Sequence, residues 1–146
     1  MNVTDIATRW LEMLEQPDTN AFAELFTEDG MYIDPAYGVV QRGRDFVRLH
    51  HRMWHASVPD FKTKVERVVV DGLTAVILYQ GTGTYSGEPI AAGEKHAPTN
   101  RWFEARVAIV LDLDDNGLVK CCTEYYDHTI MPLGEETAYG GGNAGL

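Results

Sequence analysis

The sequence predicts a single α+β domain, because the spacing of its apolar residues changes from a helical to a strand period along the chain. Up to Ala56, apolar side chains recur every three or four positions, as in amphipathic helices. After Pro59 they alternate with polar residues in long runs separated by turn sequences. Helices followed by hairpin-linked strands indicate helices that cover one face of a curved antiparallel sheet. We expect the domain to span residues 1–130 and the Gly-rich residues 131–146 to form a flexible tail.

Three helices are predicted in the first part of the chain. The first ends before Pro17, the second is capped by Asp18 or Thr19, and the third runs from Arg44 to about Ala56 before Pro59. The apolar residues expected to share a face are Val3, Ile6, Ala7, Trp10, Leu11 and Leu14 in the first helix, Phe22, Leu25 and Phe26 in the second, and Phe46, Leu49, His50, Met53 and Trp54 in the third.

The remaining elements are predicted to be strands. A short strand over residues 31–34 ends at Pro35, and the segment 35–43 is expected to be a loop. Four longer strands follow, joined by the Asp71-Gly72 turn, a loop rich in Gly and Pro, and the turn DDNG at 114–117. Their expected ranges are 61–70, 73–85, 101–113 and 118–128.

Composition narrows the class of function. A formal net charge of -10 argues against nucleic acid or an anionic membrane as partner. No apolar run is long enough for a membrane helix, and we expect a cytoplasmic protein with its two adjacent cysteines reduced. The sequence has no dinucleotide or nucleophile-elbow motif, so we expect chemistry without a cofactor.

Proton-handling side chains concentrate in the last strand, CCTEYYDHT (residues 121–129). Only one face of this strand can meet the helices, and the same alternation pairs Tyr32 with Asp34 in the first strand. If Asp34 and Asp127 both point inward, two carboxylates share an apolar cavity in which their pKa values separate into an acid and a base. In the alternative, Asp34 only ends a strand and Asp127 is solvated. The two faces are Cys121, Thr123, Tyr125 and Asp127 on one side, and Cys122, Glu124, Tyr126 and His128 on the other.

Three further groups of residues leave alternatives open. His51 and His55 have the spacing of a metal-binding pair, but no third ligand is evident, so we expect histidines on the helix surface and no metal. His50 is either a proton donor in the cavity or a buried, hydrogen-bonded imidazole. Glu104 and Arg106 share a strand face that forms either a cavity wall or an outer surface for dimer contacts.

The stretch AELFTEDGMYIDPAYGVVQRGRDFVRLHHRM resembles the entrance of a nuclear-transport-factor-2-like domain. VPDFKTKVERVVVDGLTAVILYQGTGTYSGE and DDNGLVKCCTEYYD resemble the SnoaL-like polyketide cyclase branch of that superfamily. The resemblance extends to His128 and implies a cone-shaped sheet wrapped around three helices, an enclosed pocket and a homodimer.

The resemblance also implies roles for individual residues. In SnoaL-like cyclases the carboxylate that closes the last strand is the acid/base, a position matched by Asp127. In ketosteroid isomerases of the same fold the Asp before Pro is the base, matched by Asp34, whereas Trp10 stands where the oxyanion tyrosine would be and the second oxyanion acid falls near Ile109. Members like limonene-epoxide hydrolase use an arginine, for which Arg67, Arg101 and Arg106 are the candidates.

The sequence therefore predicts an acid/base isomerase or cyclase that acts on a small hydrophobic carbonyl compound of polyketide or terpenoid type. The catalytic candidates are Asp127, Asp34 and His50, and the substrate-binding candidates are Tyr32, Trp54, Tyr125, Trp10 and Glu104. The alternatives are a non-catalytic module that binds a ligand or a protein, and a lyase of the epoxide-hydrolase or dehydratase type.

Overall fold

The computed structural model describes residues 1–91 and 96–134, and it confirms the α+β class. Six strands form one curved, unclosed sheet, in the order β2-β1-β6-β5-β4-β3. The expected tail from residue 135 onward lies outside the described residues. The elements are α1 (Val3–Glu15), α2 (Thr19–Ala23), β1 (Phe26–Asp34), β2 (Val39–Arg42), α3 (Arg44–Ser57), β3 (Lys62–Asp71), β4 (Thr74–Thr84), β5 (Trp102–Leu113) and β6 (Val119–Tyr125).

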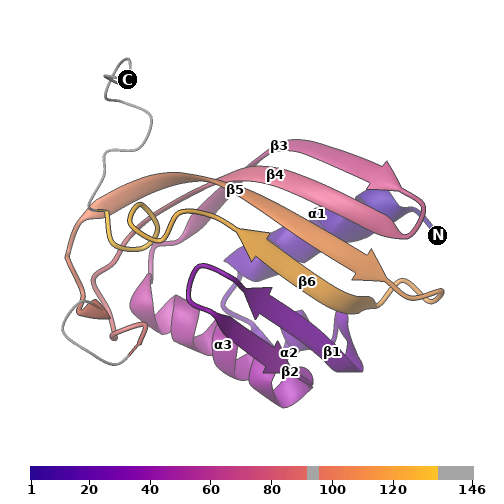
Figure 1. Cartoon of the computed structure of the whole chain (residues 1–146), viewed down its shortest axis with the longest axis horizontal. Helices are drawn as coiled ribbons and strands as arrows, with labels where there is room; N and C mark the ends of the chain where they lie inside the picture. Colours follow the sequence, from indigo (N-terminus) through magenta and orange to yellow (C-terminus); the bar gives the residue numbers. More distant parts are fainter. Residues whose placement is uncertain (92–95, 135–146) are drawn as a thin grey trace.

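The helices cover the concave side of the sheet (Figure 1). Helix α1 packs against β3 and β4, whereas α3 packs against β1 and β2. Asn2 caps α1 through its side chain, and Asp18 caps α2 in the same way. The apolar core lies between these two layers, with Trp10, Phe22 and Phe26 among its fully buried side chains.

The sheet is mixed, which corrects the expectation of a purely antiparallel one. Strands β1 and β6 pair in parallel, with Tyr32 beside Cys122. All other pairs are antiparallel, and β3, β4 and β5 form a continuous ladder of long strands. Because β1 and β6 are distant in the sequence, alternation alone does not reveal this pairing.

Several boundaries differ from those expected. Phe26 begins strand β1 and does not end the second helix, because the segment TEDG continues the strand. Residues Val39–Arg42, expected as loop, form β2 by pairing with the end of β1. Met131 and Leu133 are buried, so the packed domain extends beyond residue 130.

Helix α3 buries a different face from the one expected. Its buried residues include Val47 and His51, whereas Phe46, Leu49 and Met53 are 55%, 37% and 38% exposed. The apolar stripe of the sequence therefore lies partly on the surface. His50 and Trp54 flank the buried face and turn toward the sheet.

Candidate functional site

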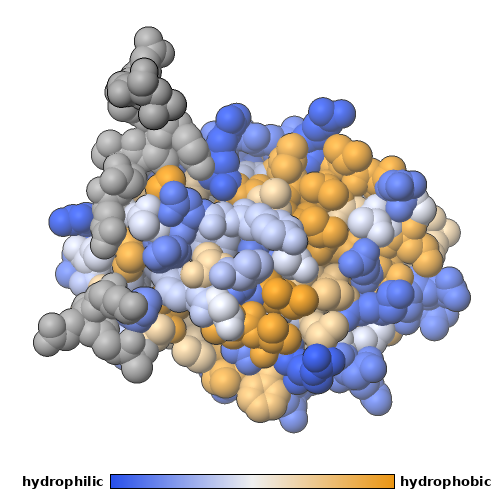
Figure 2. Space-filling view, in the orientation of Figure 1, coloured by the Kyte–Doolittle hydropathy of each residue, from blue (hydrophilic) through white to orange (hydrophobic). Residues whose placement is uncertain are grey.

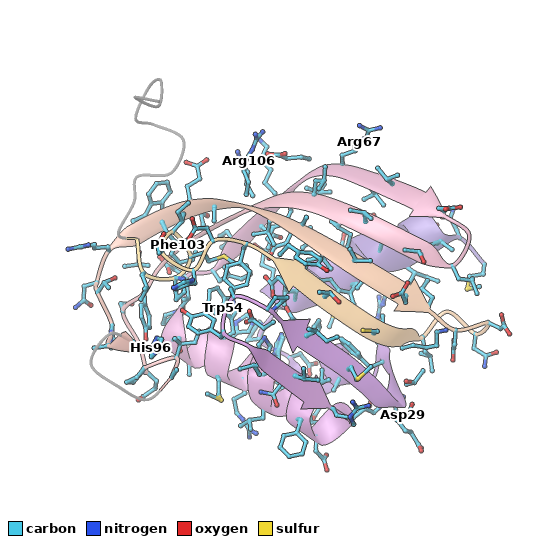
Figure 3. The ribbon with its side chains drawn as sticks, viewed as in Figure 1. Asp29, Trp54, Arg67, His96, Phe103 and Arg106 are labelled. Carbon is cyan, nitrogen blue, oxygen red and sulfur yellow. The ribbon has the colours of Figure 1, made fainter. Side chains whose placement is uncertain are left out.

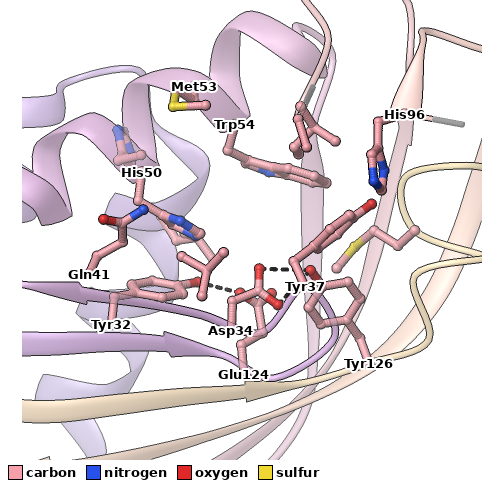
Figure 4. Close-up of a pocket in the computed structure, with 16 residues that line it drawn as sticks. Tyr32, Asp34, Tyr37, Gln41, His50, Met53, Trp54, His96, Glu124 and Tyr126 are labelled. Carbon is pink, nitrogen blue, oxygen red and sulfur yellow. Dashed lines mark hydrogen bonds between the residues drawn. The ribbon is translucent and has the colours of Figure 1, made fainter. Parts of the chain in front are cut away.

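Strands β1 and β6 bring two carboxylates to the floor of one pocket. Asp34, at the end of β1, is 5% exposed, and Glu124, within β6, is 6% exposed. Both line a cavity of about 210 Å³ between the sheet and α3 (Figure 4). This volume is below the roughly 300–1,000 Å³ of sites for drug-sized ligands, so the pocket suits a compact ligand.

Tyrosine hydroxyls hold the two carboxylates in place. Tyr126 donates to both oxygens of Asp34, at 2.9 Å to Oδ1 and 2.8 Å to Oδ2. Tyr79 donates to Glu124 Oε1 at 3.0 Å, and Tyr32 donates to Glu124 Oε2. Each buried carboxylate thus has hydrogen-bond donors but no cationic partner among these contacts.

Burial and charge repulsion act on the pKa values of the two carboxyl groups. Burial, together with the nearby charge of Asp34, raises the pKa of Glu124 to about 7, although its two tyrosine hydrogen bonds oppose this. Burial also raises the pKa of Asp34, but the Tyr126 hydroxyl and the backbone N–H groups of Tyr37 and Ala36 favour its ionised form. Glu124, with a pKa of about 7, can therefore hold a proton near neutral pH, whereas the donors around Asp34 favour its ionised form.

Aromatic rings form the walls above this floor (Figure 4). Trp54 and His50 come from α3, Tyr37 and His96 come from loops, and Tyr32 and Tyr126 flank the carboxylates. The space between α3 and the sheet is therefore apolar at its walls and acidic at its floor.

His50 faces this cavity as a neutral imidazole. Burial and the adjacent His51 lower the pKa of His50 to about 4. Its ring lies over that of Tyr32, with centroids 4.2 Å apart, and no hydrogen bond to it is found among the described residues. The expected alternative of a hydrogen-bonded buried imidazole is therefore not observed, and the ring nitrogens are available to a ligand.

Tyr85, directly after β4, anchors another part of the wall. Its hydroxyl accepts a hydrogen bond from the backbone N–H of Ile90 at 2.8 Å and donates to the carbonyl of His96. Ile90 and His96 both line the pocket. One buried phenol thus fixes two positions of the pocket wall.

Four of the eight site residues expected from the sequence lie together in this pocket. Asp34, Tyr32, His50 and Trp54 all line it. Alternation in β1 and the apolar side of the third helix therefore placed these side chains as expected.

Asp127 and Tyr125 lie outside the pocket, which corrects their expected placement. The Asp127 carboxylate is exposed, and its Oδ1 accepts hydrogen bonds from the N–H and the hydroxyl of Thr129, at 2.9 and 2.7 Å. These bonds lower the pKa of Asp127. Tyr125 is 53% exposed. For Tyr125 the cause is the register of β6: Glu124 lies opposite Ile109, a buried residue of β5, so Glu124 points inward and Tyr125 points outward. Asp127 lies beyond Tyr125, where β6 ends.

Glu104 and the candidate arginines also lie outside the pocket. Glu104 is on the exposed side of β5, and Arg67 and Arg106 project from the outer side of the sheet (Figure 3). Arg106 pairs with Glu66 at 3.4 Å, and Arg101 is exposed. The open alternative for Glu104 and Arg106 is thus resolved in favour of the outer surface.

Trp10 is part of the core below the pocket and does not line it. It is fully buried and stacks on Tyr32, with ring centroids 6.3 Å apart. Tyr32 of β1 in turn donates a hydrogen bond to Glu124. Glu124 stands across from Ile109 in the pairing of β5 with β6.

The sequence-based candidates omit Glu124, Tyr126 and Tyr79. Glu124 and Tyr126 belong to the face of the last strand that was not chosen. The sequence does contain an indication, because the apolar alternate set of β5 that includes Ile109 identifies the inward side, and β6 pairs with it. Using that indication requires the exact register between two strands, which a turn of uncertain length does not provide.

The histidine pair on α3 is structural and not on the surface as expected. His51 is fully buried; its ring contacts Thr19 Oγ1 at 2.9 Å and the Met13 carbonyl at 3.2 Å. His55 contacts the Leu14 carbonyl at 2.8 Å. Both side chains tie α3 to α1. Within residues 1–91 and 96–134, no group of three or more potential ligands is arranged to hold a metal ion.

A comparison with protein-family models matches residues 7–121 to the SnoaL-like domain. The chain belongs to the SnoaL-like family. No curated protein matches its sequence. None of the helices in the described part of this SnoaL-like chain is long and apolar enough to span a membrane.

Solved structures share the fold of this SnoaL-like chain at low identity. A candidate SnoaL-like polyketide cyclase from Jannaschia sp. CCS1 has a TM-score of 0.75 and 18% identity, over 88% of this chain and 90% of that one. A hypothetical protein with a ketosteroid isomerase-like fold from Catenulispora acidiphila DSM 44928, in complex with trimethylamine, has a TM-score of 0.72 and 21% identity, over 86% and 87%. SalBIII, an epoxide hydrolase/cyclase-like enzyme in pyran ring formation in the polyether salinomycin, has a TM-score of 0.70 and 16% identity, over 88% and 92%.

Proposed function

We propose that this SnoaL-like chain is a cofactor-independent isomerase or cyclase that acts on a compact carbonyl compound. The observation that carries the proposal is the pair of buried carboxyls at one pocket: Asp34 is held by hydrogen-bond donors that favour its ionised form, and Glu124 has a pKa of about 7. Two carboxyls whose environments separate their pKa values form an acid and a base. The SnoaL-like family and the ring-forming neighbour support a natural-product substrate of polyketide or terpenoid type.

In the proposed reaction, Asp34 removes a proton from the carbon next to the substrate carbonyl. The electron pair of the broken C–H bond moves to the carbonyl oxygen, and protonated Glu124 or the neutral imidazole of His50 donates a hydrogen bond to the resulting enolate. Return of the proton from Asp34 to another carbon shifts a double bond. Alternatively, the enolate carbon attacks a second carbonyl, which forms a ring, and the new alkoxide takes the proton. Both outcomes conserve the mass of the substrate.

Hydrogen–deuterium exchange tests this proposal without knowledge of the natural substrate. The protein is incubated in D₂O with a panel of cyclic enones and β-dicarbonyl compounds, and mass spectrometry follows deuterium uptake beside the carbonyl. Loss of a positioned base costs typically 10²–10⁴-fold in rate, so Asp34→Asn should slow the exchange by about that factor.

Asp127→Asn is the matched control, because Asp127 is a carboxylate outside the pocket. It should retain the wild-type exchange rate, whereas equal rates for wild type and Asp34→Asn would reject Asp34 as the base. A product lighter by one water would indicate the lyase alternative.

A non-catalytic binding module is the second candidate. One observation favours it: the tyrosine hydroxyls already satisfy both carboxyls within the protein, as a purely structural or ligand-holding pair would require. Under this alternative, panel compounds bind but show no exchange above the background rate.

We also propose that the chain forms a homodimer through the outer face of the sheet. We further propose that the protein is cytoplasmic. Hydrophobic side chains gather over β3 to β5 (Figure 2), and contiguous exposed apolar surface is typical of protein interfaces. A sedimentation mass of twice the monomer, reduced to one monomer by Val69→Lys, would support this. The cysteines are free, as in a reducing compartment. The exposed apolar residues of this face include Val69, Trp102 and Tyr125.

A further inference from the structure

The walls of the pocket present aromatic rings from several directions. Trp54 lies across the cavity from the carboxylate floor, and Tyr37, Tyr32 and Tyr126 surround it (Figure 4). The face of an aromatic ring carries partial negative charge, and rings grouped around a cavity attract a cation more strongly than a neutral group of the same shape.

The charges around the cavity have the same sign as the ring faces. Asp34 and Glu124 are its acidic residues, and no Lys or Arg is found among the lining residues that the structure describes. The ion pairs found in the described part of the chain lie elsewhere, at the molecular surface. The nearby charge of His128 favours the ionised form of Asp34, and a ligand cation in the cavity would compensate the buried charge further.

Two of the three histidines that line the pocket, His50 and His51, do not supply a positive charge. The pKa of His50 is lowered to about 4, and that of His51 to about 4 as well, so both rings are neutral at neutral pH. The net charge of -10 also produces a field that draws cations toward the protein and repels anions. Wall, floor and overall field therefore favour the same kind of ligand.

We propose that the pocket selects compounds that carry an ammonium group, a protonated or quaternary amine, over neutral compounds of the same shape. The aromatic walls would surround the alkyl groups of the cation, and the carboxylate of Asp34 would lie near its charge. The proposal depends on the proposed function only in taking this pocket as the substrate site. It names the substrate class as amine-bearing carbonyl compounds.

Calorimetric titration with two isosteric probes tests the proposal. Choline and 3,3-dimethyl-1-butanol have the same shape, but only choline is charged. A cation held by aromatic faces and a carboxylate should bind roughly tenfold more tightly than its neutral isostere. Trp54→Leu should remove most of this preference, and Asp34→Asn should reduce it further.

Trp102→Leu is the matched control, since Trp102 is 60% exposed on the outer face of the sheet. It should leave the choline preference unchanged. Equal affinity for the two probes, a preference for the neutral probe, or no choline binding at millimolar concentration would overturn the proposal. Because the titration requires no turnover, choline selectivity without carbonyl exchange would refute the proposed reaction alone, and exchange without selectivity would refute the ammonium proposal alone.

Discussion

Glu124 and Asp127 are carboxylates three positions apart in the sequence, yet their environments are opposite. Glu124 is buried among tyrosines and its pKa is raised to about 7. Asp127 is exposed, and hydrogen bonds from Thr129 lower its pKa. The difference arises because Glu124 faces the core from within β6, whereas Asp127 lies beyond Tyr125, the last residue of that strand. The proton chemistry of these two carboxyl groups is therefore determined by where the strand runs and where it ends, and not by the local amino-acid sequence.

Glu124→Gln should give the largest change in stability, and the change should depend on pH. The folded state holds the Glu124 proton up to about pH 7, whereas the unfolded chain loses it near the ordinary glutamate pKa of 4.5. Folding is therefore progressively disfavoured as the pH rises between these values. The shift corresponds to about 3 kcal/mol. The free energy of unfolding of the variant, relative to wild type, should rise by about that amount between pH 4 and pH 8.

Urea denaturation at a series of pH values measures the difference in the free energy of unfolding between Glu124→Gln and wild type. The buried histidines contribute equally to the two proteins, so their titration cancels in this difference. Asp127→Asn is again the control. Its folded-state pKa is lowered, so the stabilisation by Asp127 is complete above the ordinary pKa of an aspartate and is lost only in acid. The difference in the free energy of unfolding between Asp127→Asn and wild type should stay constant from pH 5 to pH 8. A flat profile for Glu124→Gln would mean that folding leaves the pKa of Glu124 unchanged.

Tyr126→Phe should change the free energy of unfolding by a smaller amount, through its contact with the pocket carboxylate of Asp34. It removes the hydroxyl that donates to both oxygens of Asp34. A hydrogen bond to a charged group contributes about 1.5–3 kcal/mol, so unfolding at pH 8 should become easier by about that amount. The acid limb of any pH–rate profile should also move to higher pH, because the ionised form of Asp34 loses a donor.

Tyr125→Phe is the corresponding control on the outer face. Tyr125 is 53% exposed, and exposed substitutions usually change stability by less than about 0.5 kcal/mol. If Tyr125→Phe and Tyr126→Phe destabilise the protein equally, the assignment of Tyr126 to the Asp34 contact is wrong.

The sequence was sufficient for the elements that have a clear period. Helices α1 and α3, the hairpin strands and the α+β class follow from apolar spacing and turn residues. It was not sufficient for β2, which is short and becomes a strand only through its pairing with β1. The second helix was extended through Phe26 because an apolar residue at helical spacing is compatible with either state.

The candidate site could be predicted only in part, for a similar reason. Asp34 and Tyr32 were placed by alternation within one strand. The choice between the two faces of β6 depends on its parallel pairing with β1 and on the contact of Ile109 with Glu124, both of which are long-range. His51 was expected at the surface because the sequence does not show that Thr19 and Met13 cover that side of α3.

The hydrogen bonds of Tyr85 support the wall of the pocket, whereas other elements support the carboxyl groups of its floor. Its hydroxyl fixes Ile90 and His96, whereas the carboxylates stand on β1 and β6. Substitutions at Ile90 or His96 would alter the wall of the pocket without moving the carboxyl groups of Asp34 and Glu124. Within such an architecture, evolution or a designer can change which molecule is accepted while the underlying chemistry is inherited unchanged.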